Sequence, residues 1–244
     1  MTKKNKTKQN TTGETTPDDT KKTTKKRNPG EAFETKLAVG RNTLKLSADD
    51  PGLKACAASV GYGAGKIAQG QAYFDALNTT YEAQKTAYTA QLNAYTKYMD
   101  LMKVSRQKNS RIVQALRLVL RDDPETLANL KPADLTKIAY GPWSEANQYF
   151  FKRLVDLPAV TGLLAGVGVP QAMVDEAKQA FVNTQAAETA HKNARAEAQR
   201  ATAAKNEAYS VYLKWMRRYI NVLAAALVDD PQMREKLGIV ARSQ

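Results

Sequence analysis

Apolar residues recur every three or four positions between Gln171 and Asp230, a run of about sixty residues without glycine or proline. That spacing over an uninterrupted run predicts one long α-helix. A second run, from about Ala64 to Arg121, carries a stripe of larger apolar residues. At about 1.5 Å per residue, a helix of this length extends for on the order of 90 Å, which exceeds the diameter of a small domain. The pattern therefore predicts an all-α protein shaped as a rod.

The two long runs belong to an internal repeat with a constant offset of 107 residues. Pro51 falls on Pro158, and the tripeptide Asp122-Asp123-Pro124 falls on Asp229-Asp230-Pro231. A shared tripeptide at a constant spacing indicates a tandem duplication. We therefore divide the chain into a tail of residues 1–30, a first helical repeat at 31–137 and a second at 138–244.

Each repeat is predicted to follow one plan. Two short helices (about 31–47 and 51–60, then about 143–155 and 158–165) lead into a glycine-rich joint and the long helix. The long helix ends at Asp-Asp-Pro, because proline cannot continue a helix and disfavours a helical residue before it. The aspartate pair is expected to cap the short helix that begins at the proline.

The stripes on the two long helices differ in size and are therefore complementary in volume. Large side chains lie seven residues apart on the first helix: Phe74, Tyr81, Tyr88, Tyr95 and Met102. Mostly alanine lies at the same spacing on the second: Ala187, Ala194, Ala201, Ala208 and Trp215. Close packing favours such a match, so we expect these rows to form the core of an antiparallel, coiled-coil-like pair.

The segment that connects the two long helices favours an antiparallel pair over a parallel pair. In an antiparallel pair, residues 124–170 would fold as a cap at one end, and residues 31–60 as a cap at the other. A parallel pair would instead force that connection to run the length of the rod. A hairpin in the first long segment, with a turn at Ser105–Ser110, is the alternative, although apolar residues at 212–217 of the second segment argue against it.

The charge of the chain favours acidic partners. The 244 residues have a net charge of +13 and a pI of about 9.7. Residues 1–30 hold nine Lys or Arg against three Asp or Glu and almost nothing apolar, a composition typical of disorder. The densest charge in this tail is Lys21, Lys22, Lys25, Lys26 and Arg27. The tail is a solubilising spacer or an electrostatic arm for nucleic acid; a nuclear-localisation signal is a further option.

A second basic set lies near the end of the first long helix. Its members share one face at 100° per residue: Lys103, Arg106, Arg117 and Arg121. They form either a solvated face with cations at a helix C-terminus or a surface that contacts phosphates. No recognisable DNA- or RNA-binding motif accompanies them, so base-specific readout is not expected.

The sequence predicts no catalytic, metal or cofactor site, and it identifies no small-molecule substrate. His191 is the only histidine, which we expect on a solvated face, and Cys56 is the only cysteine. Gly61–Ile67 is similar to a phosphate loop but lacks its first glycine and its Ser or Thr, so a helix joint is the better interpretation. With no secretory signal, no transmembrane run and no possible intrachain disulfide, we expect a cytoplasmic protein.

The endings of the two long helices, Leu120 to Leu130 and Leu227 to Gly238, read Leu-x-Asp-Asp-Pro followed by a leucine. They resemble the endings of bacterial tandem-repeat helical-bundle proteins that have no established activity, and the resemblance implies an all-helical protein without transferring any catalytic residue. Our first hypothesis is a non-enzymatic scaffold that acts through helix–helix self-association as a homo-oligomer. The alternative is a sequence-nonspecific protein that binds nucleic acid or another polyanion through the tail and the basic face.

Overall fold

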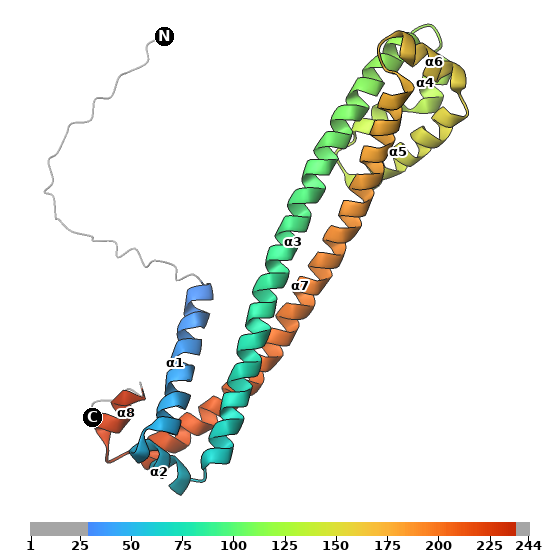
Figure 1. Cartoon of the computed structure of the whole chain (residues 1–244). Coiled ribbons are helices and arrows are strands. Elements are labelled where there is room, and N and C mark those ends of the chain that lie inside the picture. Colours follow the sequence, from blue (N-terminus) through green and yellow to red (C-terminus); the bar gives the residue numbers. More distant parts are fainter. Residues whose placement is uncertain (1–28, 238–244) are drawn as a thin grey trace, which may run out of the picture.

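The computed structural model describes residues 29–237, and every regular element in this part of the chain is a helix (Figure 1). Two long helices lie against each other along the molecule, and short helices cover both ends. The elements are α1 (Pro29–Asp49), α2 (Pro51–Ser59), α3 (Ala64–Val119), α4 (Pro124–Leu130), η1 (Pro132–Thr136), α5 (Tyr140–Val155), α6 (Pro158–Gly166), α7 (Gln171–Ala226) and α8 (Pro231–Lys236). The predicted all-α class and the two packed long helices are confirmed.

Proline and aspartate fix where the short helices begin. Proline occupies the first turn of α2, α4, α6 and α8, where its missing N–H costs no hydrogen bond. The carboxylate of Asp123 accepts a hydrogen bond from the Thr126 N–H at 3.0 Å, and Asp230 accepts one from the Met233 N–H at 3.0 Å. The sequence predicts a capping role for the aspartate pair, and in the structure the second aspartate of each pair is the cap.

The long helices end earlier than the sequence predicts. Their last residues are Val119 and Ala226 instead of Arg121 and Asp230. Leu120 and Leu227 already have non-helical ψ angles of 27° and 25°. A capping aspartate has non-helical backbone angles, so the long helix must end in the turn before it.

The contacts between α3 and α7 follow a consistent order. Contacts near the start of α3 involve the end of α7, and contacts near the end of α3 involve the start of α7. In order along α3, these contacts are Phe74 with Tyr212 (ring centroids 5.8 Å apart), Gln84 with Thr202 (3.1 Å), Tyr95 with His191 (5.3 Å) and Lys108 with Glu176 (2.6 Å). The alternative hairpin at Ser105–Ser110 is wrong, because α3 continues through it with Ser105 fully buried.

The buried apolar side chains form two separate cores, one at each end of the rod. One core joins the end of α3 and the start of α7 to α4, η1, α5 and α6, with Trp143 and Phe150 fully buried. The other joins the start of α3 and the end of α7 to α1 and α2, with Leu53 and Tyr219 fully buried. Between these cores, only α3 and α7 pack on each other (Figure 1).

The joints and the helix hydropathy complete the description. Gly61 and Gly168 have φ angles of 81° and 83°, in the left-handed region that favours glycine, at the two turns that lead into α3 and α7. The segment that is similar to a phosphate loop is therefore such a joint.

Within residues 29–237, no helix combines the length and apolar character that a membrane span needs.

Candidate functional site

The middle of the rod has a narrow and partly polar seam. A heptad row on α3 forms its centre, with its members fully buried at both ends of the rod and half-buried in the middle: Leu77, Gln84, Gln91, Tyr98, Ser105 and Ile112. The opposite row on α7 is rich in alanine, with Ala187 and Ala198 buried and Ala194 half-buried. Because glutamine and alanine bury little apolar area, this seam is held less strongly than either end core.

The predicted pairing row lies three residues before this centre row along α3. Phe74, Met102 and Ala187 are buried, and Tyr81, Ala194, Ala201, Ala208 and Trp215 are half-buried. Tyr88 and Tyr95 are 56% and 46% exposed, so their assignment to the pairing core is corrected. The reason is that this row follows the flank of the seam, where a side chain is buried only if a cap helix covers it.

The exposed part of this flank forms a continuous apolar surface on α3, which we call the mid-rod stripe: Tyr88, Leu92, Tyr95 and Met99. These side chains are 56%, 47%, 46% and 43% exposed, respectively. Their spacing of four, three and four residues is that of the a and d positions of a coiled coil. The residues 107 positions further along, on α7, are polar: Arg195, Gln199, Thr202 and Asn206.

One end of the mid-rod stripe is bounded by α1. Phe33 of α1 contacts Tyr81 of α3 and Tyr209 of α7, with ring centroids 4.8 and 5.2 Å apart, so α1 lies over the line where α3 and α7 meet. The other end is bounded by α5, where Tyr140 contacts Tyr98 at 5.9 Å. The stripe thus lies between the two caps, in the region that neither covers.

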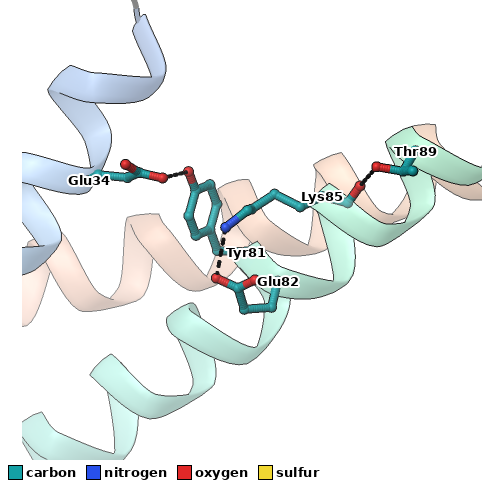
Figure 2. Close-up of polar contacts among 5 residues, drawn as sticks. All are labelled: Glu34, Tyr81, Glu82, Lys85 and Thr89. Atoms are coloured by element: carbon teal, nitrogen blue, oxygen red, sulfur yellow. Dashed lines mark hydrogen bonds and ion pairs between the residues drawn. The ribbon is translucent and has the colours of Figure 1, made fainter. Parts of the chain in front are cut away.

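Figure 2 shows the polar contacts at the α1 boundary. The Tyr81 hydroxyl donates a hydrogen bond to the Glu34 carboxylate at 2.9 Å, while the Lys85 ammonium pairs with Glu82 at 3.1 Å and lies 5.0 Å from the Tyr81 ring centroid. Partial burial, followed by the hydrogen bond to Glu34, raises the pKa of Tyr81 above its usual value. Tyr81 therefore remains a neutral hydrogen-bond donor that ties α1 to α3.

The predicted phosphate-contacting residues differ in their positions and contacts. Lys103 and Arg117 are exposed on α3 and Arg121 is exposed in the turn after it, and none of the described carboxylates forms an ion pair with them. The Arg106 guanidinium instead donates to the Ile138 carbonyl and fastens the segment after η1 to α3. The tail residues Lys21, Lys22, Lys25, Lys26 and Arg27 lie outside the described residues.

The residues that most often carry chemistry are dispersed. His191 is half-buried between Tyr95 and Tyr98, and its ring stacks on Tyr98 at 5.9 Å and 6°, so the expected solvated position is wrong. Cys56 packs half-buried against the core that contains α1 and α2. Among the described residues, no group of three or more His, Cys, Asp or Glu side chains is arranged to hold a metal ion.

A groove of about 600 Å³ lies between α1, α2 and the start of α3. Its floor includes Leu44 and Ile67, and Lys45 and Lys54 contribute to its lining. An apolar floor with lysines offers packing and charge, but no described nucleophile is paired there with a base. The mid-rod stripe is consequently the candidate functional surface.

No protein-family model, curated protein or solved structure matches the chain. The choice of the mid-rod stripe as the candidate surface therefore rests on the structure.

Proposed function

We propose that this protein is a non-enzymatic scaffold, a helical rod that acts through helix–helix association with a second copy of itself. The observation that carries this proposal is the mid-rod stripe, four large apolar side chains at heptad spacing that stay 43–56% exposed between the two caps. A soluble rod gains no stability from such a stripe unless another apolar surface packs against it.

A duplicated and antiparallel architecture is part of the same proposal. Helices α3 and α7 both have 56 residues and begin 107 positions apart, at Ala64 and Gln171. The joint glycines Gly61 and Gly168 and the capping residues Asp123 and Asp230 follow the same offset. Together with the order of contacts along α3 and α7, these features support two copies of one unit related by a pseudo-twofold axis. We place this rod in the cytoplasm, where its single cysteine would stay reduced.

Sedimentation equilibrium tests the scaffold proposal directly. We expect a mass of twice 26.8 kDa at micromolar concentration, and we expect the association to persist or strengthen as salt increases. Sedimentation velocity of the same sample should report an elongated particle. A monomer at every concentration up to about 100 μM would refute the proposal, because the Kd would then be weaker than a specific assembly requires.

A second candidate function, binding of nucleic acid or another polyanion, is favoured by Lys103, Arg117 and Arg121, which are exposed and form no ion pair with a described carboxylate. Titration of duplex DNA at several salt concentrations tests it, because each phosphate contact adds about −0.9 to the slope of log K against log salt. Glutamine at these three positions should then make this slope less steep. A full chain with glutamine at Lys21, Lys22, Lys25, Lys26 and Arg27 separates the contribution of the tail. Absence of binding at low salt would eliminate this candidate.

A further inference from the structure

The geometry points to the mid-rod stripe as an isologous interface in which α3 of a second copy packs antiparallel on α3. This inference rests on the proposed self-association and names the surface, the direction and the register. The stripe spans Tyr88 to Met99 and has neither glycine nor proline, so it is rigid before association. Little conformational entropy is lost when a rigid helix face docks.

The stripe is complementary to itself about a twofold axis. If the axis passes between Asn93 and Ala94, Leu92 meets Tyr95 of the second copy, and Tyr88 meets Met99. Each layer then pairs one aromatic ring with one flexible aliphatic side chain, and every pair occurs twice. Closed dimers require this kind of self-complementary patch.

The charges beside the stripe agree with the same register. On the flank of α3 that faces away from α7, the heptad positions next to the stripe are Glu82, Thr89, Thr96 and Lys103, and all four are exposed. About the proposed axis, Glu82 lies level with position 105 of the second copy, so Lys103 is the nearest residue on this flank, about 3 Å away along the helix; Thr89 and Thr96 are related in the same way. Lys103 has no ion pair among the described residues, whereas Glu82 has only the exposed contact with Lys85. Opposite charges therefore meet twice in each dimer.

Neither the described residues nor the sequence of residues 1–28 supplies an alternative cover. Phe33 lies beside Tyr81, so α1 approaches the stripe with its N-terminal end. Residues 1–28, which precede that end, contain a single apolar residue, Met1. Such a sequence cannot form an apolar face, which leaves a second copy as the occupant that the self-complementary pattern fits.

The size of the surface sets the expected strength. A large aromatic side chain buries about 150–250 Å², so four side chains exposed to about half contribute roughly 400 Å² per copy. Standard interfaces bury about 800 Å² per partner. With the flanking residues included, the interface lies at the small end of this range, and we expect a dimer with a micromolar Kd.

Substitution of exposed residues in the full chain tests the interface. We expect the double variant Leu92→Glu, Tyr95→Glu to raise the dimer Kd at least tenfold in sedimentation equilibrium, because each copy would bury two unpaired carboxylates. Leu118→Glu is the matched control, since Leu118 is 65% exposed on the same helix outside the stripe. Circular dichroism should show unchanged helix content in both variants.

Charge reversal tests the register. Lys103→Glu should weaken the dimer, and Lys103→Glu combined with Glu82→Lys should restore it. Cross-linking tests the direction in a Cys56→Ala background: a Thr89→Cys chain mixed with a Thr96→Cys chain should form a disulfide, while either chain alone should not. Seven helical residues separate like positions by about 10 Å, which exceeds the reach of a disulfide.

The outcomes separate this inference from the proposed function. A wild-type monomer would overturn both. A wild-type dimer that keeps its Kd in the Leu92→Glu, Tyr95→Glu variant would overturn the interface and leave self-association through another surface. Cross-links between two Thr89→Cys chains would overturn the antiparallel register.

Discussion

Gly70 of α3 allows the indole ring of Trp215 to lie against the helix backbone, and replacing it with alanine should destabilise the core that contains α1 and α2. A Cβ atom at Gly70 would meet three ring atoms of Trp215, with Cζ2 and Cζ3 at 2.5 Å. Normal carbon–carbon contacts lie at about 3.5–4.0 Å, so the ring would have to move by about 1 Å or more. Tyr219 at 5.1 Å and Tyr62 at 5.9 Å pack against the ring and oppose this movement.

Two opposing effects set the size of the change. Alanine in a helix interior is favoured over glycine by about 1 kcal/mol, and overpacking in a well-packed site costs about 1–3 kcal/mol. The overlap at Gly70 involves a rigid ring on a rigid backbone, so we place the overpacking cost at the upper end. We expect Gly70→Ala to lower the free energy of unfolding by about 1–2 kcal/mol, which corresponds to a fall in Tm of roughly 2–8 °C.

A matched glycine and a double-mutant cycle make this prediction refutable. A Cβ atom at Gly162 of α6 would meet nothing within 4 Å, so Gly162→Ala should leave stability unchanged or raise it. In a Trp215→Ala background, the loss caused by Gly70→Ala should disappear, which gives a coupling free energy of at least about 1 kcal/mol. Urea unfolding followed by circular dichroism measures all of these variants. If Gly70→Ala is stabilising, or if its cost persists without the indole ring, the packing argument is wrong.

Two further predictions concern buried polar groups. Asn109 donates to the side-chain oxygen of Asn147 at 2.7 Å and to the Leu135 carbonyl at 3.2 Å, and both asparagines are fully buried. Asn109→Ala should therefore lower the free energy of unfolding in urea by about 1–3 kcal/mol, because two acceptors lose their donor. Asn183→Ala, on the exposed surface, is the control and should lower it by less than about 0.5 kcal/mol. Equal losses would contradict the role of the asparagine pair. The buried hydroxyl of Tyr212 has no hydrogen-bond partner among the described residues, and burial raises its pKa above the value of about 10 in the unfolded chain. The stability associated with a neutral, buried Tyr212 is thus fully present below about pH 10 and is lost as pH rises further. Tyr212→Phe should equal or exceed the wild-type Tm at neutral pH, because it removes an unpartnered buried hydroxyl, and it should lose less Tm between about pH 9 and 11. An identical alkaline decline in both proteins would contradict this.

The ends of the rod could be predicted from sequence because local rules decide them. Proline fixes helix starts, aspartate caps them, and the left-handed joints need glycine at Gly61 and Gly168. Large apolar residues such as Leu53 and Phe150 are buried there by the short helices next to them in sequence. Each of these features depends on residues that are close together in sequence, so a single sequence is enough to predict it.

The middle of the rod could not be predicted in the same way, because burial there depends on which flank the caps cover. The sequence pattern favours the aromatic row through Tyr88 and Tyr95, whereas Gln84 and Gln91 occupy the centre of the seam. A glutamine at a core position looks like a surface residue to any pattern based on hydrophobicity. The site of His191, between Tyr95 and Tyr98, was missed for the same reason, because the seam is centred on the row that contains Tyr98 and His191 packs against that row.

The location of the seam centre also explains why the candidate surface exists. A heptad row on the flank of a two-helix seam is buried where a third helix covers it, as Phe33 covers Tyr81. Where the cover ends, the same apolar spacing continues for Tyr88, Leu92, Tyr95 and Met99, although the matching positions on α7 are polar. Stability of the isolated rod does not require large apolar residues there, because α7 packs in the same seam with Arg195 and Gln199 exposed. The apolar spacing on α3 is the feature that the proposed contact with a second copy would use.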